Sequence, residues 1–340
     1  MHTGLYFSPN GSHTPSSDSA TIKICAKEAE TFGYDCLFVA EPTFVDDVPD
    51  LNALDHLRII AAATDSIAIG IANSVIALEE PLAVAQQIKE LEELLPNRHI
   101  AGVAVGEDEE MFFQHSVPFE QCRDRFEEIL DVLPKIWHGE PFQHRGKNFE
   151  VTADNTKDSR NTASNDPVIW VTARDIPTLS SAAKRGYPIL PYILSEHRVV
   201  VEQYQAFAEI LERSGHDSEK IARPLVRDIF VANSSVEAEA RALDPFIKLY
   251  QGYAQNCELL DFKNQPKLPG TCSVKNILSH HLIIGDAHSV AEQLAELTTS
   301  IDCTHIIARM HVPGIQQSHA LESMSLFKNA AVPLLSDHNN

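Results

Sequence analysis

The sequence lacks paired cysteines, long apolar runs and a basic leading segment. Its six cysteines form no C-x-x-C pair and have irregular spacings, which is typical of reduced, buried thiols rather than of disulfides. No apolar run approaches the about 18 residues that a membrane span requires, and residues 1–7 show no basic stretch followed by an apolar one. These absences predict a soluble, cytoplasmic protein with no membrane partner.

Positive charge is also scarce. The chain has 27 Lys and Arg against 48 Asp and Glu, which gives a formal net charge of −21. A surface that neutralises phosphates needs clustered Lys and Arg, so we expect no nucleic-acid partner. The 44% of hydrophobic and 22% of charged residues lie near the globular average, which excludes a disordered chain.

Familiar catalytic motifs are missing as well. The sequence has no G-x-S-x-G, no Walker loop, no H-E-x-x-H and no G-x-G-x-x-G after a strand. His280 and His281 are adjacent, but no carboxylate stands at a helpful spacing, so we expect a hydrogen-bonded or solvated pair and no metal site. The acidic run 107–110 is typical of a solvated helix start, where carboxylates suit the helix dipole.

What the sequence does contain is a regular alternation of short β-rich runs and stretches of helical period. The runs are apolar throughout, as expected for parallel strands that are buried on both faces. They cover residues 4–7, 36–40, 67–71, 99–105, 168–172, 188–190, 225–232 and 304–309. Eight strands that are each followed by a helix predict an α/β fold, a (β/α)8 TIM barrel that forms a single domain over residues 1–340. A doubly wound open sheet is the alternative.

Two insertions interrupt this alternation, near residues 140–166 and 257–280. Residues 142–151 predict a hairpin with its turn at Arg145–Gly146, followed by a polar surface loop. Residues 257–279 contain Pro266, Pro269 and Gly270, and a loop of this length in a compact domain is typically functional. We therefore expect residues 257–279 to act as a mobile lid over the strand ends.

In a barrel the active site lies at the C-terminal ends of the strands. The residues at these ends are Ser8, Glu41, Asn73, Gly106, Ala173, Arg174, Asp175, Tyr192, Asn233 and His311. Glu41 either takes part in the site or forms a structural salt bridge. Asn73 either binds a ligand edge or caps a turn.

Several segments carry a family resemblance. They are YDCLFVAEP (34–42), AAATDSIAIGIA (61–72), EEPLAVAQQIKELEELLPNRHIAGVAVG (79–106), PVIWVTARDIPTLSSAAKRGYPIL (167–190) and GDAHSVAEQLAEL (285–297). In their order and spacing they resemble the luciferase-like flavin monooxygenases, and within that family the luciferase α and β subunits.

The resemblance implies a TIM barrel with insertions that binds reduced FMN supplied by a separate flavin reductase. It implies an enzyme that uses this FMN and O2 to oxygenate a small-molecule substrate. The flavin carries the chemistry, while the protein orients it and excludes water. Relatives of this kind form dimers, so the resemblance also implies a homodimer or a heterodimer.

Some family residues are replaced in this sequence. Glu41 matches the family glutamate after the second strand, but Pro42 stands where luciferases have a catalytic histidine and can neither donate nor accept a proton. The catalytic residue therefore stays unassigned. Ala104 and Val105 replace a reactive cysteine and a phosphate-binding arginine, and Val105 cannot pair with a phosphate.

Other positions match the family or offer a substitute. Arg174 and Asp175 stand where the family has a Glu-Ser step, so Arg174 could supply the missing positive charge while Asp175 caps the next helix. Thr178 matches a hydroxyl that helps to bind the phosphate, Tyr192 matches an aromatic lining residue, and the family has a cis peptide at Ala72–Asn73. The implied cofactor-binding residues are Glu41, Ala72, Asn73, Gly106, Ala173, Arg174, Thr178 and Tyr192.

These substitutions leave three functions open. The first is an FMN-dependent monooxygenase. The second is a luciferase-like barrel that has lost flavin chemistry and serves as a non-catalytic partner subunit or binds another ligand. The third uses a deazaflavin for hydride transfer.

Overall fold

The computed structural model describes residues 1–8, 15–40, 53–138, 141–153, 166–255 and 280–338. Glu41, Pro42 and the expected lid 257–279 lie outside these residues. Within the described part of the chain, no helix has both the length and the apolar character that a membrane crossing requires.

The centre of the molecule is a sheet of nine strands in which every neighbouring pair is parallel. The strands are β1 (His2–Phe7), β2 (Cys36–Val39), β3 (Ala68–Val75), β4 (His99–Ala104), β7 (Val168–Ala173), β8 (Ile189–Pro191), β9 (Pro224–Val231), β10 (Leu282–Gly285) and β11 (His305–Arg309). Their hydrogen-bonded order is β10-β9-β11-β1-β2-β3-β4-β7-β8. β8 also touches β9, so the sheet curls back on itself.

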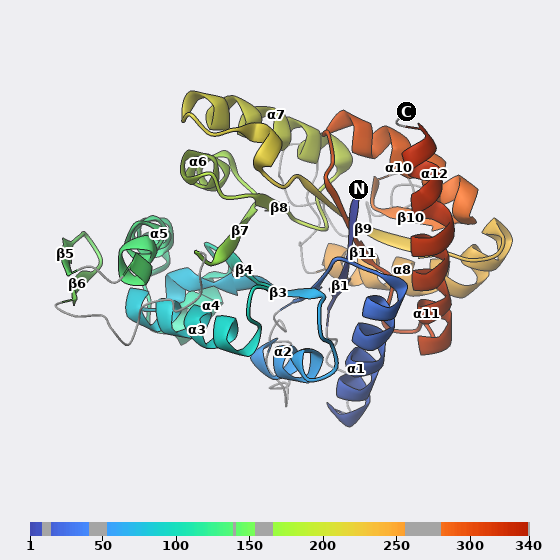
Figure 1. Ribbon diagram of the computed structural model, residues 1–340, viewed down its shortest axis with the longest axis horizontal. Helices are drawn as coiled ribbons and strands as arrows, with labels where there is room; N and C mark the ends of the chain where they lie inside the picture. Colours follow the sequence, from blue (N-terminus) through green and yellow to red (C-terminus); the bar gives the residue numbers. More distant parts are fainter. Residues whose placement is uncertain (9–14, 41–52, 139–140, 154–165, 256–279, 339–340) are drawn as a thin grey trace.

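Helices follow the strands and lie around the curled sheet (Figure 1). The α-helices are α1 (Pro15–Phe32), α2 (Ala53–Ala61), α3 (Pro81–Leu94), α4 (Glu109–Gln114), α5 (Cys122–His138), α6 (Ile176–Arg185), α7 (His197–Arg213), α8 (Ser235–Gln255), α10 (Ala287–Ser300), α11 (Gln317–Leu326) and α12 (Val332–His338). Short helical turns are η1 (Ile76–Leu78), η2 (Phe119–Gln121), η3 (Ser218–Lys220) and the π-turn η4 (Phe327–Ala331).

All eight runs expected from the sequence form strands of this sheet, which confirms the α/β class. The strand count of eight is wrong, because the structure adds β10 as a ninth. Its four residues, LIIG, stand directly after the long segment 256–279 and next to a helical pattern. A run this short between two stronger signals is easily missed in a sequence.

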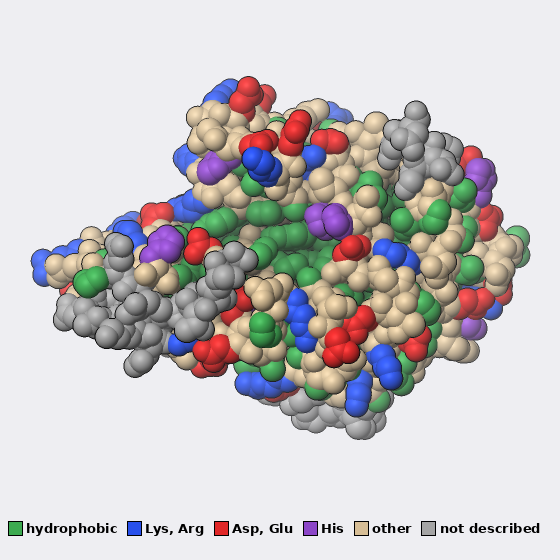
Figure 2. Space-filling model, in the orientation of Figure 1, with side chains coloured by type: hydrophobic (Ala, Val, Ile, Leu, Met, Phe, Trp, Pro, Cys, Tyr) green, Lys and Arg blue, Asp and Glu red, His purple; other side chains and the backbone are tan. Residues whose placement is uncertain are grey.

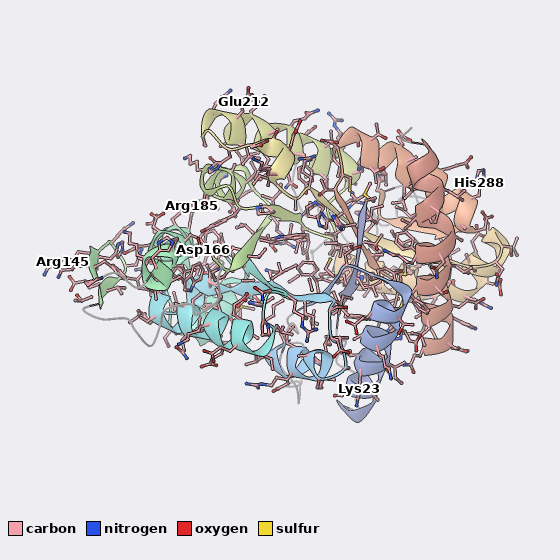
Figure 3. The ribbon with its side chains drawn as sticks, viewed as in Figure 1. Lys23, Arg145, Asp166, Arg185, Glu212 and His288 are labelled. Carbon is pink, nitrogen blue, oxygen red and sulfur yellow. The ribbon has the colours of Figure 1, made fainter. Side chains whose placement is uncertain are left out.

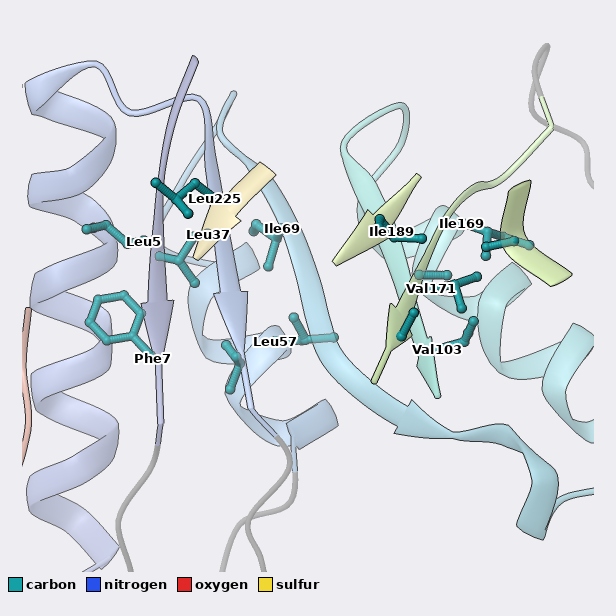
Figure 4. Packing of buried hydrophobic residues seen from close by; sticks show 14 of the residues in the cluster. Leu5, Phe7, Leu37, Leu57, Ile69, Val103, Ile169, Val171, Ile189 and Leu225 are labelled. Atoms are coloured by element: carbon teal, nitrogen blue, oxygen red, sulfur yellow. The ribbon is translucent and has the colours of Figure 1, made fainter. Parts of the chain in front are cut away.

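Side chains alternate between two apolar layers, because successive residues of a strand point to opposite faces. Leu5 and Phe7 point from β1 toward α1, as Figure 4 shows, and belong to the layer between the sheet and the helices. Phe38 belongs to a second cluster inside the curl, together with Trp170 and Ile307. We call these two layers the outer layer and the inner cluster.

The first insertion forms the expected hairpin, with strands β5 (Phe142–Arg145) and β6 (Glu150–Ala153) paired antiparallel. Figure 3 shows Arg145 at the edge of the molecule. The Glu128 carboxylate of α5 holds the hairpin, since it accepts hydrogen bonds from His144 Nε2 at 2.8 Å, from the Asn148 amide at 2.9 Å and from the Phe149 amide at 3.1 Å. The hairpin is therefore attached to the outer side of the sheet through α5.

A second carboxylate holds the chain where it enters β3. Glu30 of α1 accepts hydrogen bonds from the backbone amides of Asp65, Ser66 and Ile67, at 3.0, 2.6 and 2.9 Å. Partial burial opposes ionisation of Glu30, but the hydrogen bonds outweigh this effect and lower the pKa of Glu30 to about 2. The ionised carboxylate therefore fixes the start of the strand that carries Ala72 and Asn73.

We predict that Glu30→Gln lowers the free energy of unfolding by about 1–2 kcal/mol at pH 7, because hydrogen bonds to a charged acceptor are lost and the site is partly exposed. The folded pKa lies below the unfolded value of about 4.3, so this contribution is complete above pH 4.3 and fades as the pH falls toward 2. Urea unfolding at pH 7 and pH 3 measures the difference. Glu28→Gln on the same helix is the control, and a loss that is equal at both pH values would contradict the assignment.

Candidate functional site

The C-terminal ends of β3 and β4 form one side of the expected site. The peptide bond between Ala72 and Asn73 is cis, as the family resemblance implies. The Tyr6 hydroxyl of β1 donates a hydrogen bond to the Ala72 carbonyl at 3.3 Å. The pairing of β3 with β4 is irregular between Ile71 and Ser74, so this part of β3 departs from the regular sheet.

Two glycines of β4 and its end permit this irregular path. A Cβ atom on Gly102 would lie 1.9 Å from the Ile71 carbonyl oxygen, so the close approach of β4 to β3 requires glycine. Gly106 has a φ of +86°, and a Cβ atom there would lie 2.4 Å from Val75 Cγ1. Gly106 thus has a packing role at the position where the sequence predicts a cofactor contact.

Arg174 follows β7 at the next strand end. Its guanidinium forms an ion pair with Glu107 and lies over the Tyr192 ring, 3.4 Å from the ring centroid. The partner of Arg174 is thus Glu107 of the β4–α4 segment, while the adjacent Asp175 pairs with Arg123. Arg174 therefore joins three strand ends, those of β4, β7 and β8.

Asp175 caps α6, as the sequence predicts, and also binds an arginine that the sequence did not suggest. Its carboxylate accepts a hydrogen bond from the Thr178 amide at 2.8 Å and one from Arg123 of α5 at 2.5 Å. Arg123 also donates to the Thr178 hydroxyl at 3.0 Å. Partial burial opposes ionisation of Asp175, but the Thr178 donors and Arg123 hold the pKa of its carboxyl below the usual value.

Helix packing brings Arg123 to this place. Arg185 of α6 is labelled in Figure 3 and binds Asp131 of α5 at 2.5 Å, so the two helices lie against one another. Arg123 stands 52 residues before Asp175 in the chain. Its proximity is a tertiary effect that the local sequence pattern does not show.

A polar network lies inside the curl at the same end of the sheet. Arg309 of β11 and Asp228 of β9 are register partners, and the guanidinium donates Nε–H to Asp228 Oδ1 at 2.6 Å and Nη2–H to Oδ2 at 2.9 Å. The Tyr250 hydroxyl of α8 donates to the same carboxylate at 2.5 Å. Arg309 Nη1–H donates to the Tyr253 hydroxyl oxygen at 2.9 Å.

Burial and charge set the protonation states of this network. Burial lowers the pKa of Arg309, but the charge of Asp228 outweighs it and holds the pKa well above the ordinary value. Burial raises the pKa of Tyr6, and the charge of Arg309 offsets part of this increase. At neutral pH the network therefore contains an arginine cation, and the nearby Tyr6 hydroxyl is neutral.

The remaining sequence predictions have mixed outcomes. The Asp108 carboxylate caps α4 by accepting from the Glu110 amide at 3.0 Å, which confirms the acidic run as a helix start. His281 is buried against the Tyr250 ring, with 5.1 Å between the centroids, so it is not solvated. Among the described residues, no three His, Cys, Asp or Glu side chains gather in a geometry that could hold a metal.

A cavity of about 670 Å³ lies at the opposite end of the sheet, among residues that begin β1 and β11 or precede β9. It is lined by His2, Ala222, Thr304 and His305, among others. Figure 2 shows that hydrophobic side chains fill a hollow over β7 and β8 on the face drawn. Because the N-terminal strand ends of such folds serve stability, we place the candidate site at the other end, around Ala72, Arg174 and Tyr192.

Comparison with known proteins identifies relatives over most of the chain. A family profile described as luciferase-like monooxygenase matches residues 1–302. The chain is 27% identical over 179 residues to 2,5-diketocamphane 1,2-monooxygenase 1 of Pseudomonas putida, a match that covers 48% of each protein. The match thus spans about half the length of that relative. The alkanal monooxygenase alpha chain of the Kryptophanaron alfredi symbiont is 20% identical over 331 residues, which cover 92% of this chain and 91% of the relative.

Solved structures share the fold. A monooxygenase from Streptomyces bottropensis, RslO1, superposes with a TM-score of 0.84 at 16% identity, over 98% of this chain and 99% of that one. The oxygenating constituent of 3,6-diketocamphane monooxygenase from Pseudomonas putida, a type II Baeyer-Villiger monooxygenase in complex with FMN, superposes with a TM-score of 0.80 at 18% identity, over 98% of both chains. At these identities the likeness shows the fold alone.

We predict that the cap and the charge of Asp175 can be separated by mutation. Asn caps helices as well as Asp does, so Asp175→Asn should lower the free energy of unfolding by less than about 0.5 kcal/mol, whereas Asp175→Ala should lower it by about 1 kcal/mol. Urea unfolding of both variants at pH 7 provides the measurement. Equal losses in the two variants would show that the pair with Arg123, and not the cap, carries the stability.

Proposed function

Since the chain belongs to the luciferase-like monooxygenase family, we propose that it is a flavin-dependent monooxygenase. It uses reduced FMN and O2 to oxygenate a small organic substrate. A separate flavin reductase supplies the reduced FMN, and the protein works in the cytoplasm as a homodimer or heterodimer. We also propose that the chain is a single domain whose curled sheet closes into a barrel of the (β/α)8 type, with β10 as an additional ninth strand.

The phosphate group of FMN fits the cluster at the start of α6, and this cluster is the observation that carries the proposal. Arg123 and Arg174 offer two guanidinium groups, and Thr178 offers a hydroxyl at the start of α6. These groups compensate for Val105, which stands where the family has an arginine. The site therefore keeps guanidinium groups for a phosphate although the family position has lost its arginine.

The cluster is neutral without a ligand, since Arg123 and Arg174 pair with Asp175 and Glu107. The Glu107 side chain is 52% exposed. An exposed ion pair is worth only about 0–1 kcal/mol, so a phosphate with a charge of about −2 can replace Glu107 at Arg174. Asp175 stays in place as the helix cap.

The flavin ring fits beside the neighbouring strand ends. Ala72, Asn73, Gly106 and Ala173 offer backbone and small side chains there, and Tyr192 offers an aromatic face, with Glu41 completing the predicted set. When bound, reduced FMN supplies the two electrons that activate O2. The residues of this chain orient the ring and exclude water.

The alternative is a luciferase-like barrel without flavin chemistry. Pro42 and Val105 support it, because both replace residues that serve catalysis or phosphate binding in the family. Titration with photoreduced FMN separates the two functions. A monooxygenase binds the reduced flavin tightly and delays the return of its oxidised absorbance in air, whereas a protein without flavin chemistry does neither.

We predict that Arg123→Ala and Arg174→Ala each weaken FMN binding at least tenfold, about 1.4 kcal/mol, because each removes a charge-assisted contact with the phosphate. Riboflavin has no phosphate, so its affinity should stay unchanged. Fluorescence titration with both flavins measures the effect.

Arg213→Ala is the matched control for this titration, because Arg213 lies on the exposed side of α7 with a side chain that is 76% exposed. An equal loss of FMN and riboflavin affinity would remove the two arginines from the phosphate site. No FMN binding by the unmutated protein would favour the flavin-free alternative.

A further inference from the structure

We propose that the Tyr253 hydroxyl is a hydrogen-bond donor to substrate, held in place by the buried Arg309–Asp228 pair, and that this site selects a neutral, apolar substrate with one acceptor oxygen over an anionic one. The inference rests on the proposed function, because it assigns a substrate class to the same strand-end site. Tyr253 is the binding residue, and Arg309 and Asp228 are positioning residues.

Strand alternation places the ion pair inside the curl. Ile307 and Val226 belong to the inner cluster, and Arg309 and Asp228 stand two residues further along the same strands. Their side chains therefore share the inner face. The pair lies at the level of Tyr6, since Leu5 of β1 is the register partner of Ala308. This level is near the C-terminal ends of the strands, where the proposed flavin site is.

The hydrogen bonds of the network run from buried groups to a partly exposed one. Arg309 and Asp228 are 1% and 0% exposed, and Tyr250 is also fully buried, whereas Tyr253 is only partly buried. Three donors already occupy the Asp228 carboxylate, two from Arg309 and one from Tyr250. Because the Tyr253 oxygen accepts from Arg309, its own proton is available to another acceptor. The Tyr253 hydroxyl is thus a polarised O–H group at the less buried end of the network.

The other tyrosines near this point have different roles. The Tyr6 hydroxyl already donates to the Ala72 carbonyl. The Tyr192 ring lies against the Arg174 guanidinium, on the side where we place the flavin phosphate. Tyr253 is therefore the tyrosine of this group whose donor is directed to a ligand.

Charge balance gives the selectivity. The cation of Arg309 is cancelled by Asp228, so the network offers a strong dipole without net charge. The neighbouring buried cation, Arg227, lies on the opposite face of β9, with Leu225 and Ile229 of the outer layer. The inner cluster on the same two strands, β9 and β11, is apolar, and includes Val226, Phe230 and Ile307. An anion that enters this region loses its hydration without gaining a counter-charge. A neutral ligand with an acceptor oxygen gains a hydrogen bond and buries its apolar skeleton.

The test compares ligands that share a skeleton, in the absence of flavin. The probes are camphor and 2-decanone as neutral ketones, bornane and decane as their oxygen-free counterparts, and camphor-10-sulfonate and decanoate as anions. Binding is followed by isothermal titration calorimetry.

We expect the unmutated protein to bind at least one ketone at least tenfold more tightly than its hydrocarbon and its anionic counterpart. Tyr253→Phe should remove this tenfold preference over the hydrocarbon and leave hydrocarbon and FMN affinities unchanged, because only a hydroxyl is lost. Tyr187→Phe is the matched control, since Tyr187 is also partly buried but precedes β8 at the opposite end of the sheet. Retention of the ketone preference in Tyr253→Phe would overturn the proposal.

A second variant tests the charge balance. Asp228→Asn keeps the shape of the side chain but leaves the Arg309 cation without its counter-charge, so affinity for the sulfonate or the carboxylate should rise at least tenfold. Circular dichroism and thermal melting establish that this variant folds. If it does not fold, the comparison of Tyr253→Phe with Tyr187→Phe decides the question by itself.

The outcomes separate this inference from the proposed function. A ketone preference that depends on Tyr253 in a protein that does not bind FMN would refute the flavin function and support the substrate site. Tight FMN binding without any ketone preference would refute the substrate site alone. Failure of every probe to bind would count against the substrate class assigned here.

Discussion

Both faces of the sheet are buried, so a charged side chain on a strand is stabilised chiefly by partners inside the molecule. Arg309 and Asp228 meet this constraint as direct register partners on β11 and β9, with two hydrogen bonds between them. Breaking a buried pair of this kind costs about 3–5 kcal/mol, because the remaining charge has no solvent. The pair therefore fixes the relation of β9 to β11 and, through its further hydrogen bonds, the position of the C-terminal half of α8.

The sequence shows the architecture because strands buried on both faces need continuous apolar runs, and all eight runs found in it are strands. It does not show β10, since four apolar residues before a helix carry no periodic signal. The sequence does contain a signal for the ion pair. Arg309 and Asp228 are charged residues within the largely apolar segments HIIAR and PLVRDIFV. A charge in such a run marks a buried partner or a site. What the sequence cannot show is that the two charges occupy the same register.

The sequence predicts contacts of the strand-end site only where the two residues are neighbours in the chain. Asp175 precedes a helix that begins with Ile-Pro, so its role as a cap follows from the neighbouring residues. The partners of Arg174 and Thr178 do not follow in this way. Glu107 lies 67 residues before Arg174, and Arg123 lies 55 residues before Thr178, so folding of α5 against α6 brings the second pair together. The loss of the family arginine at position 105, where this chain has Val105, therefore does not determine which charged groups the folded site contains.

The two arginine–carboxylate pairs at this end of the sheet differ in how deeply they are buried. Arg174 and Glu107 are linked like Arg309 and Asp228, but the Glu107 side chain is 52% exposed while that of Asp228 is 0% exposed. Water can solvate Glu107 after it leaves Arg174, so a phosphate can exchange with it at small cost. Asp228 cannot exchange in this way, because its separation from Arg309 would leave two unpaired charges in an apolar interior. In the function that we propose, the same pairing therefore provides an exchangeable anion site at Arg174 and, at Arg309, a fixed dipole that a neutral substrate can use.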